Sequence, residues 1–142
     1  NAGGLCGGLG VCVTTSRRAE SPTINCTGYS NLTLSFNYIL GGYNANDMLS
    51  VFYSIDNGTN FTFLANPNVN DTCVGGQGVW KTFGMALPQE CNNVSTLKIG
   101  FNWVNNDDGV GTDPSFAVAM HKNEGVLQQI GSLGDVIITQ LE

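Results

Sequence analysis

The chain has 142 residues, enough for one domain with a substantial buried core. Only 11% of the residues are charged, well below the roughly 25% of an average protein, and the formal net charge is −6. Five basic residues against eleven acidic ones argue against nucleic acid and anionic membrane surfaces as partners. No apolar run approaches the roughly 18 residues of a membrane-spanning helix, so we expect no membrane insertion.

Five cysteines are spread over the first two thirds of the chain. Cys6 and Cys12 enclose a short glycine-rich loop, and Cys73 and Cys91 flank one candidate strand. These are the favoured disulfide pairs, and they leave Cys26 free or paired outside the chain. Sequence alone leaves the connectivity open, and a fully reduced set is the alternative. No CxxC motif occurs, and the single histidine cannot complete a usual zinc site.

The compartment is suggested by composition. Several cysteines in a chain of low charge favour an oxidising environment, so we expect a secreted or cell-surface protein. Many asparagines and threonines create Asn-x-Ser/Thr sequons. The sequons fit either a eukaryotic secreted glycoprotein or an Asn- and Thr-rich bacterial surface module in which they carry no meaning.

Period-two alternation, with an apolar residue at every second position, marks three strands, at 32–40, 49–55 and 97–103. Weaker strand candidates are 11–15, 21–25, 61–65, 79–87, 115–120, 125–130 and 135–140, with a short helical turn as the alternative at 125–130. Turns rich in Gly, Asn and Asp separate them. This pattern predicts an all-β fold, an antiparallel β-sandwich forming a single domain over residues 1–140. We expect Leu141 and Glu142 to be a tag remnant.

One pair of basic residues and one turn motif have structural interpretations. Arg17 and Arg18 are expected to form a salt bridge or a cation–π contact within the sandwich. The segment 54–61 has the form S-x-D-x-G-x-x-aromatic, the Asp-box pattern, in which Asp56 accepts hydrogen bonds from its own turn and Gly58 supplies a positive φ. We therefore expect a β-hairpin there and no ligand role.

Aromatic side chains outside the core are the candidates for stacking on sugar rings. Tyr43 lies in a Gly- and Asn-rich loop with little core to join, and Trp80 follows Gly78-Val79 at the start of a candidate strand. Trp103 falls on the apolar phase of its strand, which favours the core. We take Tyr43 and Trp80, together with Asn105, as the candidate ligand-binding residues.

The segment 105–113 concentrates oxygen ligands of the kind that calcium prefers. The candidate metal ligands are Asn106, Asp107, Asp108 and Asp113, which makes Ca²⁺ the expected cofactor. The run is not an EF-hand loop, because its first position would be Val104 and no bidentate Glu follows. A solvated acidic loop is the alternative.

Catalytic patterns are not found. His121 lies in a predicted turn, and no G-x-S-x-G nucleophile motif occurs. Glu20 and Glu90 have no motif around them, and the adjacent Asp107 and Asp108 are too close in sequence to flank a substrate. The expectation is therefore that the protein is not an enzyme.

Several segments resemble a module of large secreted proteins of Bacteroidetes. They are 12–31, 34–38, the hairpin around Asp56 and, most specifically, IGFNWVNNDDGVGTDPSFAV at 99–118. The resemblance implies a jelly-roll sandwich similar to MAM and cleaved-adhesin domains, often followed by PKD-type repeats and a type IX secretion sorting tail. Where that family usually has an Asp-Asp pair that helps bind calcium, this chain has Ala119-Met120. The family also has an additional first strand, which the tail 121–140 is expected to replace unless the chain is a fragment.

Together these features favour a non-catalytic extracellular binding or adhesion module. Its expected partners are a polysaccharide or another cell-surface glycan, bound with or without calcium, and neighbouring domains of a larger secreted protein. The alternative is a structural spacer or strand-exchanging assembly unit of a surface adhesin or filament.

Overall fold

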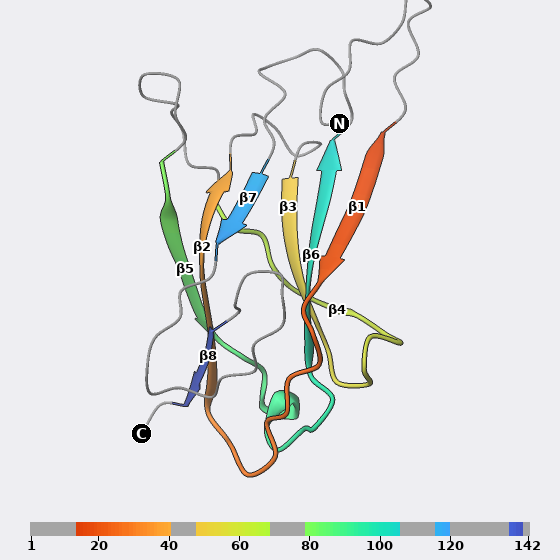
Figure 1. Cartoon of the computed structure of the whole chain (residues 1–142), viewed down its shortest axis with the longest axis vertical. Helices are drawn as coiled ribbons and strands as arrows, with labels where there is room; N and C mark the ends of the chain where they lie inside the picture. The colour runs from red at the N-terminus through yellow and green to blue at the C-terminus, as the bar shows by residue number, and fades with distance from the viewer. Residues whose placement is uncertain (1–13, 41–47, 69–78, 106–115, 120–136, 141–142) are drawn as a thin grey trace, which may run out of the picture.

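The computed structural model describes residues 14–40, 48–68, 79–105, 116–119 and 137–140. Two antiparallel sheets pack together as a β-sandwich (Figure 1). The four-stranded sheet has the order β1 (Thr15–Glu20), β6 (Lys98–Asn105), β3 (Met48–Ser54), β4 (Thr62–Ala65). The other sheet has the order β5 (Lys81–Ala86), β2 (Leu32–Leu40), β7 (Phe116–Ala119), and β8 (Ile137–Gln140) also pairs with β2. A 3-10 turn, η1 (Gln89–Cys91), precedes β6.

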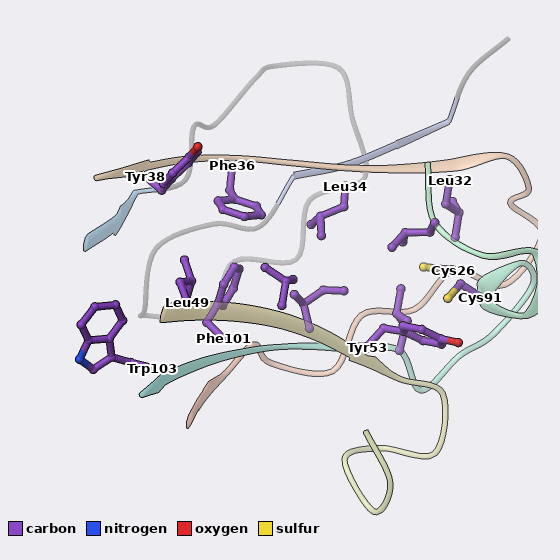
Figure 2. Packing of buried hydrophobic residues seen from close by; sticks show 14 of the residues in the cluster. Cys26, Leu32, Leu34, Phe36, Tyr38, Leu49, Tyr53, Cys91, Phe101 and Trp103 are labelled. Carbon is purple, nitrogen blue, oxygen red and sulfur yellow. The ribbon is translucent and has the colours of Figure 1, made fainter. Parts of the chain in front are cut away.

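The core lies between β2 on one side and β3 and β6 on the other (Figure 2). Every second residue of β2, from Leu32 to Leu40, is buried, and the residues between them are half-buried. Phe36 connects the layers, because its ring stacks on Phe83 at 4.9 Å and meets Phe101 edge-on at 5.0 Å. Burying each large apolar side chain contributes about 1.5–3 kcal/mol, so this alternation fixes which face of each strand turns inward.

Most of the predicted strands are confirmed. The three alternating segments correspond to β2, β3 and β6, and Trp103 lies in the core as expected, with 7% of its surface exposed. Shorter strands β4, β5, β7 and β8 occur within the weaker candidates 61–65, 79–87, 115–120 and 135–140. Of these, β8 lies antiparallel to the first half of β2.

The predicted and observed strands differ at two places. Residues 21–25 form no strand, and a single bridge joins Ile24 to Leu97. Conversely, β1 was not predicted, because all six of its residues are exposed and the apolar alternation is missing. Among the described strands, β1 lies at the edge of its sheet and pairs with β6 alone. Segment 125–130 and residues 11–13 lie outside the described residues.

The Asp-box hairpin between β3 and β4 is confirmed. Asp56 accepts hydrogen bonds from the Ser54 hydroxyl at 2.7 Å and from the backbone N–H of Asn60 at 2.9 Å. Gly58 has a φ of 89°, and its N–H donates to the Ser54 oxygen at 2.8 Å. These bonds lower the pKa of Asp56 to about 2, led by the backbone N–H of Asn60 and followed by the Ser54 and Asn60 side chains.

The structure therefore defines an all-β sandwich, while the jelly-roll connectivity and the single-domain boundary stay predictions. Within the described ranges, no helix has the length and apolar character needed to cross a membrane.

Candidate functional site

The outer side of β2 and β5 carries a row of small polar residues. On β5, Phe83 packs against the core cluster, so its neighbours Thr82 and Gly84 point outward. The register places Asn37 of β2 opposite Thr82, and Ser35 opposite Gly84. Two neighbouring strands thus present hydroxyl and amide groups side by side on the solvent face.

One hydrogen bond organises this row. The Thr82 hydroxyl donates to the Asn37 side-chain oxygen at 2.7 Å. The bond fixes the amide of Asn37 with its NH₂ group as a donor, and it leaves the Thr82 oxygen as an acceptor. The pair can therefore both donate to and accept from a ligand that lies across the two strands.

Gly84 has no side chain that would project above this row of polar residues. A Cβ atom built at Gly84 meets no atom within 4 Å among the described residues, so the space above the strand is open. The backbone of β5 can be approached closely there.

An exposed aromatic residue borders the row. Trp80 immediately precedes β5, two positions before Thr82, and is 49% exposed. Val79 beside it is 47% exposed. A Trp side chain combines a large apolar surface with an N–H donor, and Trp is enriched at binding interfaces for this reason. We call this surface, made of Ser35, Asn37, Trp80, Thr82 and Gly84, the Trp80 face.

The outer side of the four-stranded sheet is built differently. A Cβ atom at Gly100 of β6 would lie 2.9 Å from Phe61 Cε1 and 3.1 Å from Arg18 Cδ, so these side chains already fill the space above the strand. The Arg18 guanidinium lies 4.0 Å from the centre of the Phe61 ring, a cation–π contact. Phe52 and Phe63 meet edge-on at 5.8 Å nearby. We call Arg18, Phe52, Phe61, Phe63 and Gly100 the Phe61 face.

The charges beside the Phe61 face pair with one another. Glu20 accepts from Arg18 Nε at 3.2 Å and lies 3.7 Å from Lys98 Nζ. The predicted salt bridge and cation–π contact of the basic pair are thus both made by Arg18. All three side chains are partly exposed to solvent, so each ion pair contributes about 0–1 kcal/mol to stability.

The three residues predicted to bind a ligand do not all lie among the described residues near the Trp80 face. Trp80 lies at the Trp80 face, whereas Tyr43 lies outside the described residues. Asn105 is the last residue of β6, and its backbone pairs with Thr15 of β1.

The predicted metal ligands Asn106, Asp107, Asp108 and Asp113 also lie outside the described residues. In the part of the chain that the structure describes, no three His, Cys, Asp or Glu residues gather as a metal site would require. Calcium binding stays a prediction.

Two of the five cysteines lie among the described residues. Cys6, Cys12 and Cys73 lie outside the described residues, while Cys26 and Cys91 are both buried thiols. Their neighbourhood was not apparent in the sequence, because 65 positions separate them.

Two glutamates without a motif have identifiable roles. Glu20 pairs with Arg18 and Lys98, as described above. Glu90 accepts a hydrogen bond from the hydroxyl of Tyr53. This hydrogen bond, followed by burial, raises the pKa of Tyr53.

Sequence reasoning identified Trp80 but not the polar row beside it. The alternation of β2 marks Ser35 and Asn37 as outward-facing, and this signal was present in the sequence. Their pairing with Gly84 and Thr82 depends on the contact between β2 and β5, which no local pattern encodes.

Comparison with protein-family models, with curated proteins and with solved structures found no match to this chain.

Proposed function

We propose that this chain is a non-catalytic extracellular binding module that recognises carbohydrate through the Trp80 face. The observation that carries the proposal is a half-exposed tryptophan bordering an open row of hydroxyl and amide groups. An indole offers a flat apolar surface for the C–H face of a sugar ring. Asn37, Thr82 and Ser35 supply donors and acceptors for the sugar hydroxyls.

The charge pattern of this surface favours a neutral ligand. β2 contains no charged residue, and Lys81 is the one charged residue of β5. Binding would therefore depend on stacking and hydrogen bonds, with little contribution from charge. We expect the affinity to change little between low and physiological salt.

The environments of three carboxylates support a non-catalytic role. Asp56 is held by its own turn, Glu20 lies between two basic side chains, and Glu90 accepts from Tyr53. A glycosidase needs two carboxyl groups facing one another across a substrate. These three have local structural functions instead.

The wider setting is part of the same proposal. The resemblance to secreted modules of Bacteroidetes suggests a jelly-roll unit within a larger cell-surface protein, beside other domains. Calcium held by Asn106, Asp107, Asp108 and Asp113 would be an addition to the site, so the experiment includes an arm without it.

The proposal is tested by a glycan array and by pull-down on insoluble polysaccharides, with calcium and again with EDTA. Trp80→Ala is compared with Phe63→Ala on every ligand that binds. Phe63 is a matched control for Trp80, because the two are 54% and 49% exposed and Phe63 lies on β4 of one sheet while Trp80 directly precedes β5 of the other.

We expect Trp80→Ala to weaken binding by tenfold or more, which is typical of a central aromatic contact, and Phe63→Ala to leave it unchanged. Equal loss in both variants would assign the site to another surface. Loss of glycan binding in EDTA would indicate that calcium, held by residues 105–113, takes part in binding. No binding under either condition would favour the spacer or strand-exchanging unit.

A further inference from the structure

Two cysteines that are far apart in the sequence meet at one end of the core. Cys26 and Cys91 both have 0% of their surface exposed and belong to the same buried cluster. Figure 2 shows their sulfur atoms side by side between the two sheets, next to Tyr53. The contact joins the connection from β1 to β2 with the connection from β5 to β6.

The backbone around the pair is held by hydrogen bonds between the two connections. The N–H of Cys26 donates to the carbonyl of Val94 at 2.7 Å, and the N–H of Asn93 donates to that of Tyr29 at 2.9 Å. The N–H of Gly28 donates to the Asn93 side-chain oxygen at 2.8 Å. These bonds hold the two segments against one another next to the two cysteines, as a cross-link requires.

The surroundings do not suit a reactive thiol or a metal site. Burial raises the pKa of Cys26, and burial followed by the charges of Glu90 and Cys26 raises the pKa of Cys91 to about 12. Burial therefore disfavours the thiolate form of both side chains in the folded protein, which argues against a nucleophilic role. A zinc or copper site would need further ligands, and the described residues bring no third one to the pair.

We propose that Cys26 and Cys91 form a structural disulfide when the chain folds in an oxidising compartment. The oxidant is a disulfide donor, either a thiol–disulfide oxidoreductase or glutathione disulfide. One cysteine thiolate attacks the donor's disulfide and releases one donor thiol. The second cysteine then attacks the mixed disulfide and releases the other donor thiol. The two protein thiols lose two electrons and two protons, and the donor is reduced to two thiols.

The timing of this reaction follows from burial. Exchange needs a thiolate that an oxidant can reach, and both are lost once the core closes. The bond therefore forms while the connections are still open. Once formed, it links the two sheets of the sandwich at this end and is protected from reductants by the same packing.

This pairing excludes the Cys73–Cys91 bond predicted from the sequence, because Cys91 can join only one partner. Cys26 is favoured as that partner, because it is fully buried in the same core cluster as Cys91. Cys73 lies outside the described residues.

The connectivity can be read by peptide mapping of the full chain secreted into an oxidising compartment. Trypsin alone leaves Cys26 and Cys73 together on the peptide 19–81, since no Lys or Arg separates them. A second cleavage on the N-terminal side of aspartate, before Asp47 and Asp71, separates them into 19–46 and 71–81. Cys91 is then alone on the peptide 82–98.

We expect a non-reduced digest to contain 19–46 linked to 82–98, and this species to disappear after reduction. A link between 71–81 and 82–98 would overturn the proposal, and so would an unlinked 82–98 peptide. Cys73→Ser is the matched control and should retain the link, whereas Cys26→Ser should abolish it.

A second measurement covers the effect on stability. Against the same oxidised background, Cys26→Ala with Cys91→Ala should lower the Tm by about 10 °C or more, since a cross-link across a long loop constrains the unfolded chain. Cys73→Ala should change the Tm by much less. Equal shifts for both variants would contradict the proposal.

Discussion

Gly84 and Gly100 lie in the middle of strands on the outer faces of opposite sheets, yet their surroundings differ completely. Above Gly100, the ring of Phe61 and the side chain of Arg18 occupy the space that a Cβ would need. Above Gly84, a Cβ would meet no atom of the described residues within 4 Å. Among the described residues, the space above Gly100 is thus filled by the protein's own side chains, and the space above Gly84 is not. The difference teaches that exposure of aromatic residues alone does not identify a ligand surface, because Phe63 is as exposed as Trp80.

Of the substitutions that test this difference between the two glycines, Gly100→Ala should have the largest effect on stability. The new methyl group would press on Phe61 and Arg18, so the free energy of unfolding should fall by about 1–2 kcal/mol. Urea denaturation measures this change. Combining the substitution with Phe61→Ala should reduce its cost, because the clashing ring is gone. A full, additive loss in the double variant would show that Phe61 does not cover Gly100.

Gly84→Ala is the matched substitution on the other face, and its sign should be opposite. The methyl group meets no neighbour, while the unfolded chain loses conformational freedom, so we expect a gain of about 0.4–1 kcal/mol. The same urea experiment applies. A loss as large as that of Gly100→Ala would mean that the Trp80 face is not open.

The smallest expected effect concerns the hairpin that positions Phe61. The pKa of Asp56 is lowered from 3.8 to about 2, so the unfolded state binds the proton more readily than the folded state. The contribution of Asp56 to stability is therefore complete above about pH 4 and is lost as the pH falls through about 2. Denaturation between these pH values should show a steeper loss for the wild type than for Asp56→Asn. Parallel curves would contradict this assignment.

Much of the fold was predictable because burial leaves a trace in the sequence. Every second residue of the strand β2 is apolar, because one of its faces meets the core, while its other face is half-buried. β1 leaves no such trace, because all of its residues are exposed and the backbone ladder with β6 holds it. Residues 21–25 were expected to form a strand, but among the described residues they make one isolated bridge, between Ile24 and Leu97, and a backbone hydrogen bond from Ser21 to Ile99.

The candidate site was predictable to a smaller extent. Trp80 could be identified by its position before a strand, and Asn37 by its phase in the alternation. That Asn37 lies opposite Thr82 follows from which strands become neighbours, which is decided by the whole core. The contact of Cys26 with Cys91 has the same origin, because two separate connections between the sheets meet at one end of the sandwich.

The central claim, that the Trp80 face and not the Phe61 face binds the glycan, is tested most directly by amide chemical-shift mapping. The ¹⁵N-labelled chain would be titrated with the oligosaccharide that binds best on the array. Ligand-dependent shifts should appear at Ser35, Asn37, Thr82, Gly84 and the indole N–H of Trp80, while Arg18, Phe61 and Gly100 keep their positions. Shifts centred on Arg18, Phe61 and Gly100, with none at the Trp80 face, would contradict the claim.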